Sequence, residues 1–194
     1  QTKNELTFQP DHLMGAGQAV FQTTQNVGYT YGTALTFKMD FFHFNAGHNL
    51  GNFRFSVTTD DRSTYADGLS TNGNVAATWT VLHPSSATTD GSLSLGVDSD
   101  GSILASGDNP ATSIYTIQAV TSIVGITGIR LEALENESLP YAGPGLFSSN
   151  GNFVLTEITL DAVPFDVSEP GAVIAFVSAL LAMPLCRRRS RYIP

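Results

Sequence analysis

The histidines are the first side chains of this sequence that could do chemistry, because a neutral imidazole is a good metal ligand. The 194-residue chain contains four of them, and only His43 and His48 are separated by one short, glycine-containing loop. This pair is a candidate metal site, although hydrogen bonding within the loop is the explanation we favour. The single cysteine, Cys186, excludes an internal disulfide and a zinc site of the CxxC type.

Catalysis would need an activated nucleophile or a pair of carboxylates. The sequence contains no Gly-x-Ser-x-Gly elbow, which removes the usual hydrolase nucleophile. Glu132 and Glu157 both fall in predicted strands and have the residue type of a glycosidase pair, but the sequence does not fix their separation. We expect no catalytic activity and keep a small glycan hydrolase as the less favoured alternative.

Aromatic rings are the groups that would contact a sugar. Trp79, the only tryptophan, is able to stack on a sugar face, but it alternates in phase with apolar neighbours and is therefore predicted to lie in the core. Tyr65, Tyr141 and Phe147 fall in predicted loops, where a ligand would reach them more easily. Phe147 is equally well explained as a plug for one end of the fold.

Two arginines, Arg54 and Arg130, occupy the polar phase of their predicted strands. A guanidinium group suits bidentate contact with hydroxyls or carboxylates. In a chain this acidic, an ion pair with a neighbouring Asp or Glu explains each arginine better. Together with Tyr65 and Tyr141, they complete the set of candidate ligand-binding residues.

Charge is distributed unevenly along the chain. Seventeen acidic residues face nine basic ones, for a net charge of −8. Four of the nine are Arg187, Arg188, Arg189 and Arg191, so the first 186 residues hold only five basic residues and a net charge of −12. A body this acidic repels phosphate backbones, which argues against nucleic-acid binding.

The elements that must position these residues are short strands. Apolar and polar residues alternate with a period of two, which is typical of strands that bury one face. We predict strands at residues 5–9, 18–24, 34–43, 53–59, 76–82, 93–97, 102–106, 113–120, 127–134 and 152–160. Because the turns between them are frequent and no amphipathic helix appears before residue 171, the body is predicted to be an all-β, antiparallel β-sandwich.

Two series of motifs in this body resemble a known family. One series, which contains Trp79, is residues 78–84, 100–107, 115–117, 125–134, 138–140, 143–145 and 150–157; the other is residues 32–37 and 48–58. They are similar to the galactose-binding-like, carbohydrate-module-like segments of planctomycete surface proteins with cytochrome-type domains. The resemblance implies a galactose-binding-like or jelly-roll sandwich that binds polysaccharide.

The order of the two series differs from that family, in which the half with the tryptophan comes first. This difference indicates either a circular permutation or the tail of a longer array. A permutation predicts that the strands near residues 6–8 and 155–160 lie close together.

Galactose-binding-like domains often hold a structural calcium ion, so the resemblance also makes calcium an option here. The acidic loops around Asp60, Asp61 and Asp67 are the candidates, and no position is assigned. Residues 98–102 have the composition of the start of a calcium loop but lack its bidentate glutamate. Their Asp-Gly step predicts a hairpin turn instead.

Residues 171–186 form an uncharged, apolar stretch of sixteen residues that the arginine cluster follows directly. A membrane-spanning helix needs about 20 residues, and flanking side chains can supply the difference by snorkelling. Arginines on one flank orient such a helix with that flank in the cytoplasm, which places the acidic body on the other side. The alternative is a buried core helix with a basic cap, for which an all-β body has little use.

Ser168, Glu169 and Pro170 stand just before this stretch. A Glu-Pro motif, a short apolar helix and an arginine cluster are together similar to the PEP-CTERM sorting signal of Gram-negative-type bacteria. In that family a Pro-Glu-Pro tripeptide is recognised by the membrane protease exosortase, and Ser168 replaces the first proline here. The resemblance implies exosortase as a partner and requires export, so we expect an N-terminal signal peptide ahead of Gln1.

These expectations divide the chain into a β-sandwich module (residues 1–162), a spacer with the sorting motif (163–170), a transmembrane helix (171–186) and a basic cytoplasmic tail (187–194). We expect a protein of the cell envelope or outer surface, first anchored in the inner membrane and in contact with its lipid. Its sandwich is expected to bind polysaccharide or extracellular matrix without catalysis. The alternative is a purely structural envelope or biofilm component.

Overall fold

The computed structural model describes residues 3–4, 7–8, 17–65 and 77–165. The predicted sorting motif (Ser168, Glu169 and Pro170), the apolar stretch at 171–186, the arginine cluster and Asp67 lie outside the described residues. Among the residues it does describe, the structure contains no helix that is both long and apolar enough to cross a membrane.

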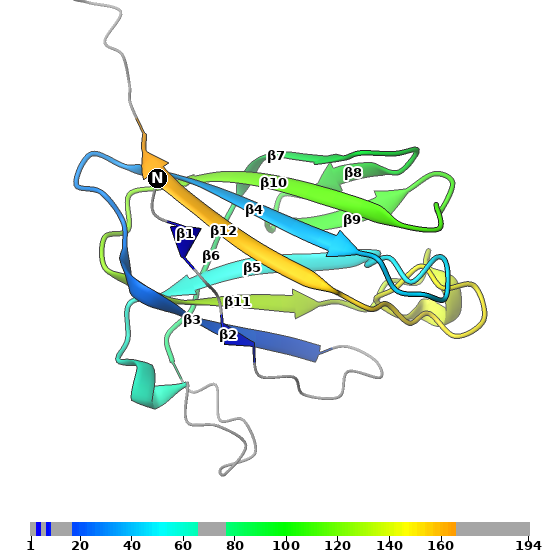
Figure 1. Cartoon of the computed structure of the whole chain (residues 1–194), viewed down its shortest axis with the longest axis horizontal. Helices are drawn as coiled ribbons and strands as arrows, with labels where there is room; N and C mark the ends of the chain where they lie inside the picture. Colours follow the sequence, from blue (N-terminus) through cyan, green and yellow to red (C-terminus); the bar gives the residue numbers. More distant parts are fainter. Residues whose placement is uncertain (1–2, 5–6, 9–16, 66–76, 166–194) are drawn as a thin grey trace, which may run out of the picture.

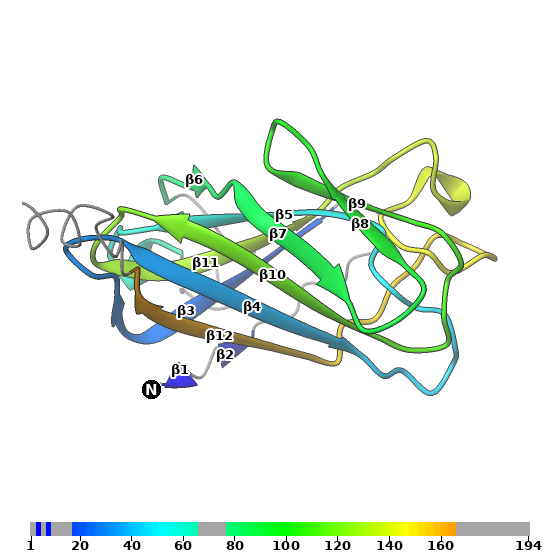
Figure 2. The same cartoon turned by 90° about the horizontal axis from the view of Figure 1, so that it is seen from above.

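The described residues form two antiparallel sheets packed face to face (Figures 1 and 2). One sheet has the order β1-β12-β4-β10-β7, and the other has the order β2-β3-β11-β5-β9-β8, with β6 paired to β5. The strands are β1 (Lys3–Asn4), β2 (Thr7–Phe8), β3 (Gly17–Val27), β4 (Thr33–Phe41), β5 (Asn52–Thr58), β6 (Thr80–Val81), β7 (Pro84–Thr89), β8 (Ser94–Val97), β9 (Ser102–Ser106), β10 (Ser113–Thr121), β11 (Ile126–Ala133) and β12 (Glu157–Pro164). The predicted all-β, antiparallel sandwich is confirmed.

Several strands differ from the prediction. Around the single strand expected at residues 5–9, the structure describes two short strands, β1 and β2, which belong to different sheets. Only β6 pairs within the strand expected at residues 76–82, and β12 begins at Glu157 rather than at residue 152. No periodic pattern indicates β7, because its residues are Pro, Ser, Ala and Thr and do not alternate between apolar and polar. β7 is an edge strand that pairs with β10 alone, so it can do without a buried apolar face.

The two ends of the described chain lie side by side, in part as a permutation predicts. Lys3 pairs with Asp161 and Asn4 with Leu160, which places β1 next to β12. β2 instead pairs with β3 in the other sheet. The C-terminal strand β12 therefore lies next to Lys3–Asn4, and not next to Thr7–Phe8 as expected.

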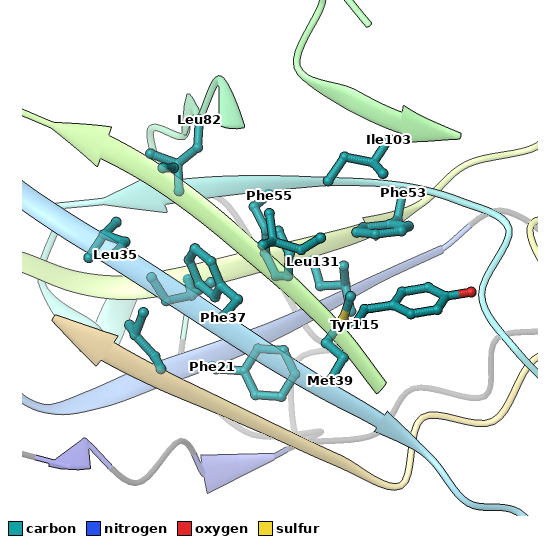
Figure 3. Close-up of a cluster of buried hydrophobic side chains, with 14 of the residues drawn as sticks. Phe21, Leu35, Phe37, Met39, Phe53, Phe55, Leu82, Ile103, Tyr115 and Leu131 are labelled. Atoms are coloured by element: carbon teal, nitrogen blue, oxygen red, sulfur yellow. The ribbon is translucent and has the colours of Figure 1, made fainter. Parts of the chain in front are cut away.

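The core lies between the sheets and is built from the inward phase of each long strand (Figure 3). Phe37 of β4 stacks on Phe55 of β5 across the sandwich, with ring centroids 4.2 Å apart. Tyr115 of β10 is completely buried and donates its hydroxyl to the carbonyl oxygen of Leu50 at 2.8 Å. Burial raises the pKa of Tyr115, so its hydroxyl remains a donor.

The sandwich has two ends that carry different segments (Figures 1 and 2). At the pocket end lie the loops of residues 42–51, 107–112 and 134–156. At the exit end lie the turns of residues 28–32 and 122–125 and the last residues of β12. Strand β4 runs from one end to the other over nine residues, which separates them by about 27 Å.

Candidate functional site

A pocket with a volume of about 380 Å³ opens at the pocket end, between the three loops. It lies where residues 46–47 and 146–148 meet residues 109–111, in the segment that follows β9. Small and apolar residues dominate its walls, and the described residues that line it carry no charge. They are Ala46, Gly47, Asn109, Pro110, Ala111, Leu146, Phe147 and Ser148.

Two asparagine side chains hold these loops together. Asn49, which is completely buried, donates from Nδ2 to Oδ1 of Asn109 at 2.7 Å and to the carbonyl oxygen of Pro110 at 2.8 Å. Asn109 donates in turn to the carbonyl oxygens of Gly47 at 2.9 Å and Leu146 at 3.1 Å. Each amide thereby satisfies backbone groups of a different loop, so the shape of the pocket is set by hydrogen bonds rather than by a strand. The sequence prediction missed both asparagines, because an Asn in a Gly- and Pro-containing loop is usually a turn former.

Phe147 forms an aromatic wall of the pocket. Its ring stacks on the imidazole of His48, with centroids 3.8 Å apart and planes 20° from parallel. His48 is buried and donates from Nδ1 to the carbonyl oxygen of Asn45 at 2.9 Å. Stacking on the hydrogen-bonded His48 ring therefore fixes the orientation of the Phe147 ring. From the sequence, Phe147 is a candidate either for ligand contact or for a plug of one end of the fold.

The predicted histidine pair does come together. The rings of His43 and His48 lie edge to face with centroids 4.9 Å apart. The backbone N–H of Asn45 donates to Nδ1 of His43 at 3.3 Å, so both rings take part in hydrogen bonds of the loop. In the part of the chain that the structure describes, no three His, Cys, Asp or Glu side chains are grouped so as to hold a metal ion.

The two candidate arginines lie on the outer face of the β3–β11–β5 sheet, away from the pocket. Glu132 accepts hydrogen bonds there from Nε of Arg54 at 3.0 Å and from Oγ of Ser56 at 3.3 Å, and its carboxylate lies 3.3 Å from Nη2 of Arg130. Arg54 also lies 3.7 Å from Asp100. The prediction that both arginines form ion pairs with acidic neighbours is therefore confirmed.

The environment of each arginine shifts its pKa differently. The hydrogen bond that Arg54 donates to Glu132 raises the pKa of Arg54, because it stabilises the charged guanidinium. Burial lowers the pKa of Arg130, whose side chain is only 16% exposed. Both arginines share the carboxylate of Glu132, and Asp100 supplies a second negative charge beside Arg54.

Trp79 and Tyr65 cover this ion-pair cluster. The guanidinium carbon of Arg130 lies 5.1 Å from the ring centre of Trp79, and Tyr65 meets the same indole edge to face at 5.5 Å. Trp79 is half-buried on the outer face, so the prediction of a core position for it is wrong. Tyr65 is buried rather than presented in a loop, and Gly128 makes room for it: a Cβ at that position would lie 2.7 Å from its ring. Burial raises the pKa of Tyr65.

Tyr141, the fourth candidate, is at the pocket end but is not one of the lining residues. Its side chain is 76% exposed, and its backbone has φ of 56°, followed by Ala142 with φ of 53°. Two consecutive non-glycine residues in the left-handed region are uncommon and store backbone strain. The structure therefore presents Tyr141 to solvent on a strained turn.

The carboxylates considered for catalysis do not face each other. Glu132 lies on the outer face of β11, and Glu157 lies on the outer face of β12 in the opposite sheet. The described acidic residues considered for calcium accept hydrogen bonds from the backbone. Asp60 accepts from the N–H of Thr78 at 2.6 Å, which joins two segments, and Asp61 accepts from the N–H of Ser63 at 2.9 Å within its own turn.

The predicted hairpin at residues 98–102 is confirmed. It joins β8 and β9, with the N–H of Gly101 donating to the carbonyl of Asp98 at 3.0 Å. Gly101 has φ of 82°, which is the left-handed conformation that an Asp-Gly turn requires.

Comparison with known proteins finds no matching protein family, no similar curated protein and no similar solved structure. The chemistry of the pocket is accordingly the basis for assigning a function.

Proposed function

We propose that this protein is an exported surface protein whose sandwich binds a neutral polysaccharide in the pocket, without catalysis. The observation that carries the proposal is the pocket itself: about 380 Å³, a fixed aromatic wall and an uncharged lining. Ligand sites for small molecules have volumes of about 300–1,000 Å³ and combine apolar walls with a few polar groups. One sugar unit of a longer chain fits this size.

The lining matches the chemistry of an uncharged sugar. The apolar face of a sugar ring packs against an aromatic side chain, and Phe147 supplies one that His48 holds in place. The hydroxyl of Ser148 and the second lone pair of Asn109 Oδ1 are hydrogen-bonding groups at the same wall. A charged polysaccharide would find no compensating charge among the described lining residues.

The C-terminal sequence supports export and anchoring. The Glu-Pro motif at Ser168, Glu169 and Pro170, the apolar residues 171–186 and the following arginines have the layout of a PEP-CTERM signal. Exosortase is the partner that this layout implies, and the lipid of the inner membrane is the first anchor. The mature protein then belongs to the cell envelope or outer surface.

A galactose-binding-like, circularly permuted module is the finer fold that we propose for the sandwich. The pairing of Lys3–Asn4 with β12 supports it, because a permuted chain requires that the original ends lie close together.

A purely structural role in the envelope is the second candidate. It is favoured by the outer-face cluster, where Arg54 and Arg130 are engaged with Glu132 rather than available to a ligand.

A glycan array tests the binding function. The full-length protein in detergent is applied to neutral glucans and galactans and to acidic alginate, together with the variants Phe147→Ala and Tyr31→Ala. We expect binding to at least one neutral glycan and none to alginate. Phe147→Ala should weaken that binding at least about tenfold, since the lost stacking and burial exceed 1.4 kcal/mol. Tyr31→Ala removes an exposed ring at the other end of the sandwich and should leave the affinity unchanged.

Two results would overturn the proposal. If the wild-type protein bound no neutral glycan, the structural role would replace it. If Phe147→Ala bound as tightly as the wild type, the pocket would not be the site. Intact-mass measurement of the protein from its native host tests the sorting step: a C-terminus between residues 166 and 171 supports exosortase cleavage, whereas a retained Pro194 overturns it.

A further inference from the structure

Apolar side chains are exposed in unusual number at the exit end. Ten large apolar residues of the described chain are exposed, and six of them belong to this end of the molecule. These six are Tyr29 (39% exposed), Tyr31 (91%), Val120 (43%), Val124 (54%), Val163 (44%) and Phe165 (39%). Single exposed apolar residues are ordinary, but a group of six on one end indicates a contact surface.

Backbone contacts and strand pairing bring the six residues together at this end. Gly28, beside Tyr29, packs so closely on Val124 that an added Cβ would lie 2.8 Å from its Cα. Phe165 donates its N–H to the carbonyl of Gly32 at 3.0 Å, on the other side of the same turn. Val120 and Val163 flank Ala34, since both are paired with it across neighbouring strands. We call these six residues the exit patch.

The exit patch lacks charge in a strongly acidic protein. No charged residue occurs between positions 17 and 37 or between positions 113 and 129, which include both turns. The charged groups that border it are Asp161, two residues before Val163 on β12, and the loop of Asp60, Asp61 and Arg62, which belongs to the other sheet. The composition of the exit patch therefore favours contact with an apolar environment over contact with a charged partner.

The chain leaves the sandwich from within the patch. Phe165 is a member of it, and the apolar stretch begins only six residues later, at position 171. Six residues span at most about 20 Å when fully extended. If residues 171–186 cross a membrane, the exit patch is therefore held close to the bilayer surface, and the pocket end points away from it (Figure 1).

We infer that the exit patch docks on the outer surface of the lipid bilayer and holds the sandwich upright, with its pocket facing outward. This inference rests on the membrane anchoring in the proposed function. Tyrosine rings favour the boundary between head groups and acyl chains, and the two tyrosines of the turn are placed to enter it. Because the contact is apolar, it forms on zwitterionic lipid and does not weaken with salt.

Depth-dependent quenching tests the docking. The full-length chain with Cys186→Ser is reconstituted in phosphatidylcholine vesicles that contain spin-labelled lipid, and a fluorophore is attached at Tyr31→Cys. Phe44→Cys is the matched control, because Phe44 is an aromatic residue of the pocket end with 87% exposure. Quenching at position 31 should be at least about threefold stronger than at position 44, since the interfacial layer is only about 5–10 Å deep. The quenching should be the same at low and high salt.

Vesicle flotation in the same samples separates this inference from the anchoring. If the protein floats with the vesicles but position 31 is not quenched, the docking is wrong and the anchoring stands. If the protein does not float, the anchoring fails first and the docking with it. Equal quenching at both positions would overturn the upright orientation. A blue-shifted label at position 31 without quenching would mean that residues 171–186 or a second copy of the chain cover the patch, which also overturns the docking.

Discussion

Glu132 is the residue whose loss should most clearly reveal the role of the outer-face cluster. The variant Glu132→Gln keeps the shape of the side chain and removes its charge. Arg54 and Arg130 would then share a partly buried site without the carboxylate that both of them contact. We expect this variant to be destabilised by much more than an ordinary surface substitution, because an uncompensated buried charge is costly.

The structure sets the size of the effect. Breaking a fully buried ion pair costs about 3–5 kcal/mol. The three side chains are 16–25% exposed, so water screens part of the interaction and the expected loss is about 2–3 kcal/mol. For a domain of this size, that corresponds to a fall in Tm of about 4–12 °C.

Urea unfolding and calorimetry measure the change. Glu157→Gln on β12 is the matched control, because it is the same substitution at an exposed position of the opposite sheet. A triple variant with methionine in place of Arg54, Arg130 and Glu132 should recover most of the stability, since an apolar cluster needs no compensating charge. If Glu132→Gln differed from Glu157→Gln by less than about 0.5 kcal/mol, the cluster would not stabilise the fold and our reasoning would be refuted.

Two further predictions concern single groups. Tyr115→Phe leaves the buried carbonyl of Leu50 without its donor and should cost about 1–3 kcal/mol, measured by urea unfolding. Hydrogen bonds from the hydroxyl and the N–H of Ser102 hold the pKa of Asp100 below its usual value. A lowered carboxyl pKa adds stability above the unfolded value of about 3.9, and this is lost as the pH falls through the folded value. The Tm of the wild type should therefore fall more steeply than that of Asp100→Asn below about pH 4.

Matched variants decide both outcomes. Tyr141→Phe removes a hydroxyl from an exposed ring and is the control for Tyr115→Phe. If the two variants lost the same free energy of unfolding, the hydrogen-bond argument for Tyr115 would be contradicted. Asp98→Asn makes the same charge change on the same hairpin. If it flattened the acid limb of the Tm profile as much as Asp100→Asn, the effect would come from net charge and not from the hydrogen bonds of Asp100.

The strands could be predicted where the burial of a face produces an alternation of apolar and polar residues in the sequence. Strands β4, β5, β10 and β11 each turn apolar side chains into the core at alternate positions, and these residues mark the strands within a few positions of their ends. A strand that is only partly buried lacks this alternation. The edge strand β7 has no apolar face, so no pattern in the sequence predicts it.

Trp79 shows how the same reasoning fails at a boundary. The predicted core position depends on its alternation with Ala77 and Val81, which assumes that one strand runs through residues 76–82. Only Thr80 and Val81 pair there, so Trp79 precedes the strand and is not bound by its alternation. The indole instead lies over Arg130, which offers it a cation.

The two ends of the sandwich differ in how much of them the sequence reveals. At the exit end, the turns of residues 28–32 and 122–125 have a composition that is visible in the sequence, with aromatic and aliphatic residues and no charge. The pocket depends on Asn49, Asn109 and Phe147, which are up to 98 residues apart and meet only because three strands end at the same edge. The two asparagines are ordinary loop residues by type and by local spacing, and only the aromatic ring of Phe147 makes it a candidate in the sequence. The three residues form a site only because the ends of three strands bring their loops together at the pocket. A periodic pattern in the sequence predicts those strands, but it does not predict which loop side chains line the pocket.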